Sequence, residues 1–356
     1  MNAVLYIHGM YGNANESAHY RRLFDGCAVE GLDYQTFTPW ETGKEIAAAV
    51  RALKKNYEKV ILVAVSIGAY FSMHADIDGL ADRAYFISPV VDMERMIDRM
   101  MRAAGVSEED LRAAGEIETP GGTLSYAYLT YARTHPGRLS APTSILYGGR
   151  DGLVPRDEIE AFAGARGARL TVMEDGEHRF FTEEQMRFLD EWLKRERLTL
   201  RPLAESDREA LIALAKNEEI KKTYMLPDFK NVEKENAFFD RMLACSLSER
   251  HFLRAISLDG DLIGMFNDCA VNGKCVEVGY FIDPAHKGHG YATEALRKAI
   301  AELFQRGFDT VTAGYFEGNT ASRRVMEKCG MRPLCKTETV IYRGVRHICP
   351  LMGISK

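Results

Sequence analysis

The feature that most constrains the fold is a set of three short, uninterrupted apolar runs, at residues 60–65, 84–91 and 144–148. Apolar runs of this length without polar alternation are typical of strands buried on both faces of a parallel sheet. Apolar residues recur at helical spacing over residues 43–57, ahead of the first of these runs, and again over residues 182–197. The first half of the chain is therefore expected to be α/β, with a mostly parallel sheet.

The pattern changes near residue 198, and we predict two domains, 1–197 and 198–356. A chain of 356 residues exceeds the usual size of one domain. Cys27 alone precedes the boundary, and the other six cysteines follow it. After the boundary, the turn signals at 258–261, 271–274 and 342–345 indicate hairpins, and helical periodicity recurs between them. The second half is therefore expected to be α+β.

A tight turn with a serine follows the first long apolar run. Ser66 lies in Ala-Val-Ser-Ile-Gly, between that run and a helical segment, and a turn of this kind holds its serine in strained geometry. A serine nucleophile needs a base and an orienting acid from later strand ends. Asp151 and His178 each follow a predicted strand in that order. The backbone N–H groups of Met10 and Ile67 are candidates for an oxyanion hole, and Asp157 and Asp175 are rivals of Asp151.

The segments HGMYG, AVSIG, GGRDGLVP and GEHRF resemble, in this order, those of the α/β-hydrolase superfamily. The resemblance covers residues 1–197 and looks like a minimal member of the superfamily. It implies Ser66 as nucleophile, His178 as general base and then acid, and Asp151 as the residue that orients the imidazole. Ala64 stands where a glycine is commoner.

Residues 92–140 interrupt the sheet pattern. A predicted helix at 92–104 carries five apolar residues on one face: Met93, Met96, Ile97, Met100 and Met101. As a cap over Ser66, this helix would favour an apolar acyl group; as ordinary packing, it would be a core helix. Methionine suits both roles, so both interpretations stay open.

In the second half, a strand at 275–282 leads through a glycine-containing turn to a helix at 291–305. Backbone N–H groups and the helix dipole converge at such a turn and bind pyrophosphate. The spacing fits neither the Rossmann nor the Walker motif. The predicted pyrophosphate-binding residues share this turn: Lys287, Gly288, His289, Gly290, Tyr291 and Ala292.

The segments LTLRPL, VEVGYFIDPAHKGHGYATEAL and NTASRRVMEKCGM resemble the GNAT superfamily of N-acetyltransferases, most closely the branch that acetylates the N-termini of ribosomal proteins. The resemblance covers residues 198–356. It implies acetyl-CoA as co-substrate, with Asn319 helping to seat the pantetheine arm or the substrate. It also implies an amine acceptor, either a small molecule or a protein N-terminus.

Transfer to an amine needs a base, and Glu277 on the predicted strand is the candidate, acting through a water. A solvated strand carboxylate is the alternative interpretation. Met326 occupies the position at which many family members carry a tyrosine that protonates the thiolate. The general acid is therefore left open between Tyr280, Tyr291 and Tyr315.

Composition excludes several function classes. The net charge of −5 gives no reason to expect nucleic acid, and no apolar stretch reaches the length of a membrane span. The start of the chain reads as a strand and not as an export signal. The seven cysteines contain no C-x-x-C pair, so we expect reduced thiols, no metal, and a cytoplasmic protein.

The sequence thus predicts a bifunctional enzyme: a serine hydrolase of ester, thioester or amide bonds, with a small-molecule acyl substrate, and an acetyl-CoA-dependent N-acetyltransferase. The fusion motivates the hypothesis that one domain removes an acyl group that the other installs. The alternative is that only one half is catalytic and the other is a binding or acetyl-CoA-sensing module.

Overall fold

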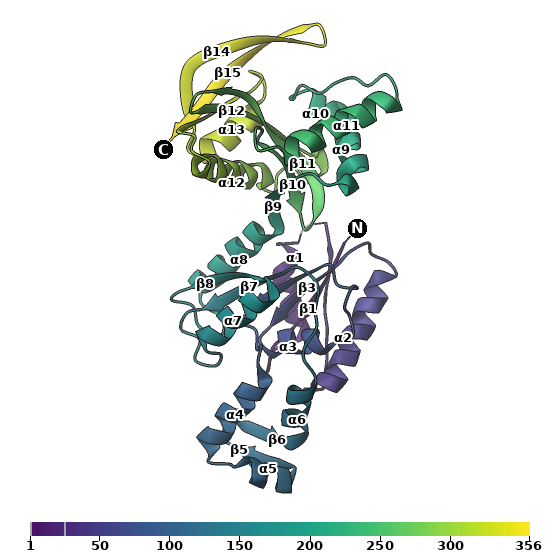
Figure 1. The fold of residues 1–356 in the computed structure, drawn as a ribbon, viewed down its shortest axis with the longest axis vertical. Helices are drawn as coiled ribbons and strands as arrows, with labels where there is room; N and C mark the ends of the chain where they lie inside the picture. Colours follow the sequence, from purple (N-terminus) through teal and green to yellow (C-terminus); the bar gives the residue numbers. More distant parts are fainter. Residues whose placement is uncertain (1, 25) are drawn as a thin grey trace. The chain divides into compact units, whose positions relative to one another are not determined.

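The computed structural model describes residues 2–24 and 26–356, which divide into two compact units at residues 1–194 and 195–356. Unit 1 holds strands β1–β4, β7 and β8 with their connecting helices and an inserted group of elements (Figure 1). Unit 2 holds strands β9–β15 with its own helices. Each unit has its own sheet and its own cores, so each is described by itself.

The sheet of unit 1 has six strands in the order β2-β1-β3-β4-β7-β8, and every neighbouring pair is parallel. The chain passes from β1 outward to β2 and returns to β3 on the other side of β1, so the strand order reverses between β1 and β3. Such a switch point opens a crevice at the carboxyl ends of the strands. The strands are β1 (Ala3–Ile7), β2 (Ala28–Gly31), β3 (Val60–Val65), β4 (Arg83–Ile87), β7 (Thr143–Gly148) and β8 (Arg169–Met173).

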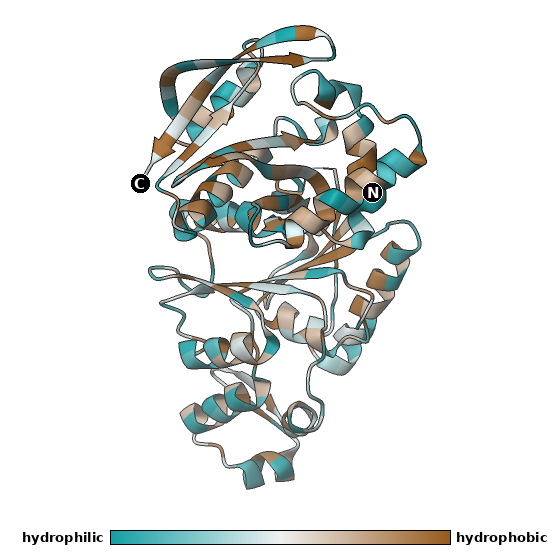
Figure 2. Ribbon diagram, turned by 45° about the horizontal axis from the view of Figure 1, so that its top comes forward, coloured by the Kyte–Doolittle hydropathy of each residue, from teal (hydrophilic) through white to brown (hydrophobic). Residues whose placement is uncertain are grey.

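Both faces of this sheet are buried, which explains the uninterrupted apolar runs. In β1, for example, Leu5 belongs to the core that also contains residues of α2 and α3, whereas Tyr6 belongs to the core that contains residues of α8. In Figure 2 the helices carry both brown and teal residues, as expected of helices that bury one side. The connecting helices are η1 (Ala14–Glu16), α1 (Ser17–Arg21), α2 (Pro39–Lys54), α3 (Ile67–His74), α7 (Arg156–Arg166) and α8 (Glu183–Arg197).

An insertion between β4 and β7 forms the predicted excursion. It consists of α4 (Met93–Ala104), α5 (Glu108–Ala114), the hairpin β5 (Glu116–Thr119) and β6 (Gly122–Ser125), and α6 (Tyr126–Thr134). These elements gather at the lower end of unit 1 in Figure 1. Asp92 caps α4 by accepting a hydrogen bond from the Arg95 backbone N–H, and Gly105 ends the helix in the left-handed region.

The sheet of unit 2 has seven strands in the order β14-β15-β13-β12-β11-β10-β9. Only β12 and β13 run parallel, and the other pairs are antiparallel, so the predicted α+β class is confirmed for this unit. The strands are β9 (Leu198–Arg201), β10 (Leu253–Leu258), β11 (Asp261–Asn272), β12 (Cys275–Ile282), β13 (Thr310–Gly314), β14 (Arg332–Tyr342) and β15 (Val345–Ser355).

Two further cores cover the two faces of this second sheet. One contains residues of α12 and α13, such as Leu296 and Met326, and the other contains residues of α9 and α11, such as Leu211 and Phe239. The helices are η2 (Glu205–Asp207), α9 (Arg208–Lys216), α10 (Glu218–Lys221), α11 (Val232–Leu247), η3 (Pro284–His286), α12 (Tyr291–Gln305) and α13 (Thr320–Lys328).

Several element boundaries differ from the sequence-based expectation. The predicted strand at 84–91 ends at Ile87, because Ser88 adopts a positive φ of 43°. The helix expected at 43–57 begins earlier, at Pro39, where a missing N–H costs nothing in the first turn. Strand β2 and the β5–β6 hairpin were not expected at all; both are short, β2 is mostly half-buried, and half of the hairpin residues are exposed to solvent.

Candidate functional site

Ser66 lies at the turn between β3 and α3, with φ 54° and ψ −121°. A positive φ is strained for a residue with a side chain, and such strain gathers at functional sites. The turn is tight because α3 packs closely on β1: a Cβ at Gly68 would lie 2.7 Å from the Ile7 carbonyl oxygen. Glycine at position 68 is therefore required for this approach.

Three side chains form a hydrogen-bonded chain beside this turn. Ser66 Oγ lies 2.9 Å from His178 Nε2, and His178 Nδ1 lies 2.7 Å from Asp151 Oδ2. Ser66 is 8 % exposed, and the Asp151 side chain is fully buried. The three residues predicted to act together are thus in hydrogen-bonding reach of one another.

The Asp151 carboxylate is held by backbone groups as well as by the histidine. Its Oδ1 accepts hydrogen bonds from the N–H groups of Leu153, at 2.8 Å, and Val154, at 3.0 Å. The two donors fix the orientation of the carboxylate and leave Oδ2 for His178. The rival carboxylates lie elsewhere: Asp175 is exposed and pairs with Arg150, and Asp157 lies in the first turn of α7.

The loops that carry Asp151 and His178 approach each other closely because two glycines end β7. A Cβ at Gly148 would lie 2.6 Å from the Gly176 carbonyl oxygen, and one at Gly149 would lie 2.5 Å from the carbonyl oxygen of Glu174. The Arg150 N–H donates to the carbonyl oxygen of Gly176 at 2.8 Å. The Gly-Gly pair before Arg150 and Asp151 therefore allows the β8 loop to present His178.

The loop after β1 lies next to Ser66. A Cβ at Gly9 would be 3.1 Å from Ser66 Cβ. His8 is buried, stacks on Tyr34 at 4.0 Å between ring centroids, and bonds through Nδ1 to the Gly9 carbonyl oxygen. His8 thus holds the loop backbone. Met10 and Ile67, whose N–H groups are the predicted oxyanion donors, both line the same cavity as Ser66.

That cavity has a volume of about 1090 Å³ and is lined by both Ser66 and His178. From the insertion, Met93, Met96, Ile97 and Met100 line it, whereas Met101 does not. Helix α4 therefore covers the cavity as well as packing in a core, which combines the two interpretations left open by the sequence. Sequence reasoning missed several aromatic lining residues, among them Phe37, Trp40 and Tyr128.

In unit 2, Glu277 lies where β12 and β13 separate. The two strands pair only from Cys275 with Thr310 to Glu277 with Thr312, although β12 continues to Ile282. Burial raises the pKa of the Glu277 carboxyl, the nearby Glu338 carboxylate adds to the rise, and Lys336 opposes it. A partly buried carboxylate with a raised pKa at a strand opening is a candidate base.

The predicted pyrophosphate turn lies between β12 and α12. Gly288 and Gly290 have φ of 89° and 83°, and a Cβ built on either would meet nothing of the chain within 4 Å. The two glycines therefore bring bare backbone to open space. Gly290 is also the N-cap of α12, whose first turn places N–H groups without intrahelical acceptors at this turn.

The remaining predicted residues of unit 2 have structural partners. Asn319 caps α13, since its Oδ1 accepts from the Ser322 N–H at 3.1 Å. The Tyr280 hydroxyl lies 3.1 Å from Ser322 Oγ, and burial raises its pKa above the ordinary value. Met326 is buried in the core beside α12.

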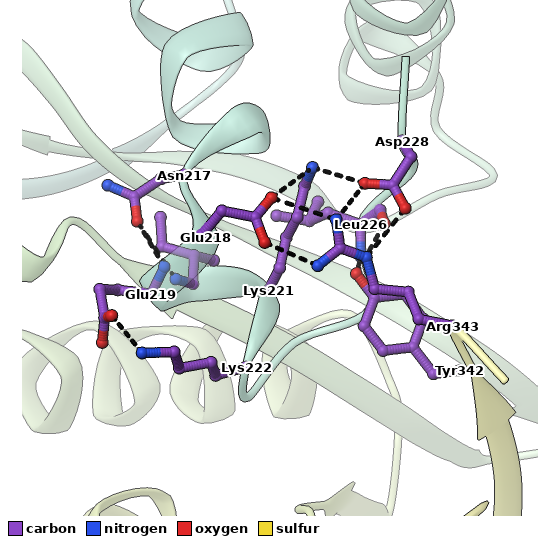
Figure 3. A network of polar contacts seen from close by, with 10 residues as sticks. Asn217, Glu218, Glu219, Lys221, Lys222, Leu226, Asp228, Tyr342 and Arg343 are labelled. Carbon is purple, nitrogen blue, oxygen red and sulfur yellow. Dashed lines mark hydrogen bonds and ion pairs between the residues drawn. The ribbon is translucent and has the colours of Figure 1, made fainter. Parts of the chain in front are cut away.

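A charged network ties the β14–β15 hairpin to the segment between α9 and α11 (Figure 3). Arg343, at the hairpin turn, pairs with both Glu218 and Asp228, and Tyr342 exchanges hydrogen bonds with the backbone of Leu226. These pairs lower the pKa values of both carboxyls. The same segment carries Tyr224, whose hydroxyl donates to Asn267 Oδ1.

Within residues 2–24 and 26–356, no helix combines the length and the apolarity needed to cross a bilayer. In the same described part of the chain, no group of three or more His, Cys, Asp or Glu side chains is placed to hold a metal ion.

Comparison with known proteins places residues 197–332 in an acetyltransferase (GNAT) domain. The uncharacterized N-acetyltransferase YoaA of Bacillus subtilis (strain 168) is 29% identical over 145 residues, which cover 39% of this chain and 82% of that protein. The probable N-acetyltransferase YjcK of the same organism is 41% identical over 54 residues, 15% of this chain and 30% of that protein.

Among solved structures, the microcin C7 self-immunity acetyltransferase MccE, in complex with acetyl-CoA and AMP, is 20% identical with a TM-score of 0.42, and the match covers 46% of this chain and 95% of that one. The ribosomal L7/L12 alpha-N-protein acetyltransferase RimL is 17% identical with a TM-score of 0.41, covering 45% and 90%. The family match lies outside residues 1–194, so the α/β-hydrolase prediction stays a prediction.

Residues 197–332 thus match a GNAT acetyltransferase domain, in the C-terminal part of the chain where the sequence predicts one.

Proposed function

We propose that the chain is bifunctional, with a serine hydrolase of ester, thioester or amide bonds in unit 1 and an acetyl-CoA-dependent N-acetyltransferase in unit 2. The first assignment rests on one observation above all: Ser66, His178 and Asp151 are joined by hydrogen bonds of 2.9 and 2.7 Å at the edge of a cavity. The second assignment, for unit 2, names the residues that are proposed to carry the acetyltransferase reaction.

In unit 1, Ser66 Oγ attacks the carbonyl carbon of the substrate while His178 Nε2 takes its proton. Asp151 accepts the Nδ1–H and stabilises the imidazolium that forms. The N–H groups of Met10 and Ile67 stabilise the oxyanion of the tetrahedral intermediate. His178 then returns the proton to the leaving group, and an activated water releases the acyl group from Ser66.

In unit 2, the turn at Lys287–Ala292 fits a pyrophosphate, because its two glycines at positive φ leave the backbone open and it begins a fifteen-residue helix. Acetyl-CoA, when bound, supplies the acetyl group as a thioester. Glu277 takes the proton of the attacking amine through a water, and Asn319 helps to seat the pantetheine arm or the substrate. The acceptor is an amine of a small molecule or a protein N-terminus.

Separate experiments test the two proposals. For unit 1, intact mass is measured after treatment with a fluorophosphonate; we expect one adduct on the wild type and none on Ser66→Ala. A folded wild type that takes no adduct would overturn the hydrolase. For unit 2, CoA release from acetyl-CoA is followed against a library of amines and N-terminal peptides, with Glu277→Gln as the comparison. Tight acetyl-CoA binding without turnover of any amine would replace the transferase by an acetyl-CoA-sensing module, an alternative for which Met326 at the usual tyrosine position leaves room.

A further inference from the structure

The cavity beside Ser66 has an unequal distribution of charge. Two carboxylate side chains and one guanidinium line it, namely those of Glu16, Glu116 and Arg179, and all three belong to exposed residues. The buried part of its wall is mainly apolar and is formed in part by Met93, Met96 and Ile97, none more than 9 % exposed. The Glu16 carboxylate accepts a hydrogen bond from the buried Tyr6 hydroxyl. Apart from this contact and the Ser66–His178 pair, the depth of the cavity offers a mainly apolar surface.

The mouth of the cavity is also apolar. Five large hydrophobic side chains of unit 1 are exposed among the described residues, and four of them line this cavity: Met10, Tyr11, Phe37 and Leu153. Phe181, the fifth, is 66 % exposed and is not part of the lining. Exposed apolar side chains gathered around one opening mark a binding site.

The size of the cavity excludes a small substrate as a good fit. Its volume of about 1090 Å³ slightly exceeds the range for pockets that bury a drug-sized ligand, roughly 300–1,000 Å³. An acetyl group would leave most of this space to water. Poorly ordered water against an apolar wall is displaced favourably by an apolar group.

We infer that the substrate of unit 1 carries a large apolar acyl group, an aliphatic chain of about eight carbons or an aryl group of similar bulk, bound under α4. This inference rests on the proposed hydrolase. Ser66 Oγ forms an ester with the acyl carbon as the bond to the leaving oxygen, sulfur or nitrogen breaks. His178 gives the leaving group its proton, and water then releases the carboxylic acid. The methionines of α4 adapt to chains of different shape.

The test is kcat/KM for p-nitrophenyl esters from acetate to octanoate. Each methylene that becomes buried is worth up to about fourfold, so partial burial of six methylenes gives an expected rise of roughly 10- to 1,000-fold. A second series keeps the acetyl group and enlarges the alcohol. A profile that is flat or falls with acyl length overturns the inference, and so does a rise confined to the alcohol series.

Variants at the mouth of the cavity test whether the preference for long acyl chains arises there. Phe37→Asp and Leu153→Asp are expected to lower the octanoate-to-acetate ratio of kcat/KM at least fivefold, since both side chains line the opening. The ratio is used because a general loss of catalysis cancels in it. Phe181→Asp is the matched control, an exposed aromatic outside the lining, and should leave the ratio unchanged. An equal effect of all three variants would contradict the role of the cavity.

Labelling of Ser66 by a small fluorophosphonate tests the hydrolase proposal separately from the apolar acyl inference. Without labelling of folded protein, the hydrolase proposal itself fails. With labelling that is lost in Ser66→Ala but no preference for long acyl chains, the hydrolase stands and the apolar acyl inference alone is wrong.

Discussion

Asp151→Asn is the most informative single change in unit 1, because the structure dictates how the new amide must lie. Two backbone N–H groups, of Leu153 and Val154, point at Oδ1, and they need an acceptor. The amide oxygen of asparagine must take that place, which turns its NH2 group toward His178 Nδ1. His178 Nδ1 then has to accept, so the imidazole proton moves to Nε2, where it blocks proton transfer from Ser66.

The wrong tautomer costs enzymes with a Ser–His–Asp triad roughly 10⁴ in kcat, which corresponds to about 5.4 kcal/mol at 1.36 kcal/mol per decade. We expect this loss in kcat for the best p-nitrophenyl ester, with a parallel loss in the rate of fluorophosphonate labelling. The backbone contacts of the loop are retained, so thermal unfolding should change little. Asp175→Asn is the control, since that carboxylate is exposed and pairs with Arg150. Folded Asp151→Asn with more than one tenth of wild-type kcat would refute the reasoning.

Three further predictions concern unit 2. Glu277→Gln should lower kcat of the transferase by about 10²–10⁴-fold without weakening acetyl-CoA binding. Because the base must be deprotonated and burial raises its pKa, the wild-type rate should rise with pH through a pKa above the ordinary value of 4.5. A variant with the same pH profile as the wild type would exclude this role. Arg197→Ala should lower the free energy of unfolding by about 3–5 kcal/mol, because the side chains of Arg197 and its partner Asp259 are both 2 % exposed. Urea unfolding measures the loss. A loss under about 1 kcal/mol would show that the ion pair is not needed for stability. Arg343→Gln removes the ion pairs that lower the pKa values of Glu218 and Asp228, so both pKa values should rise toward their ordinary range, as NMR titration would measure. Arg346→Gln on the same hairpin should change neither, and unchanged pKa values in Arg343→Gln would contradict the pairing.

The sequence predicts those parts of the fold that local pattern determines. Helix α12 begins and ends where periodicity and the preceding glycine indicate, at Tyr291 and Gln305. The three predicted hairpin turns all join adjacent antiparallel strands. The hydrogen-bonded contact of Ser66, His178 and Asp151 follows from the same reasoning, because the carboxyl ends of neighbouring parallel strands meet at one edge of a sheet.

Other features depend on contacts between segments that are distant in the sequence, and no local sequence pattern indicates them. Strand β2 has four residues, Ala-Val-Glu-Gly, and forms only by pairing with β1 at the edge of the sheet. The cavity draws its wall from Phe37, the methionines of α4, Tyr128 and Leu153, which the sequence separates by more than a hundred residues. The methionine periodicity of α4 indicates an apolar face but not what that face covers.

The apolar cavity bears on the hypothesis that unit 1 removes an acyl group that unit 2 installs. The proposed reaction of unit 2 transfers an acetyl group, which has a single methyl to bury, whereas unit 1 is proposed to gain its selectivity from about six further methylenes. At up to about fourfold per buried methylene, an acetyl amide competes poorly for Ser66 against a long-chain ester. On the proposed activities, the two units act on different acyl groups, and an amine acetylated by unit 2 should persist in the presence of wild-type unit 1. Mass spectrometry of that product, compared between wild type and Ser66→Ala, decides the matter: loss of acetate only in the wild type would restore the removal cycle and contradict selection by the cavity.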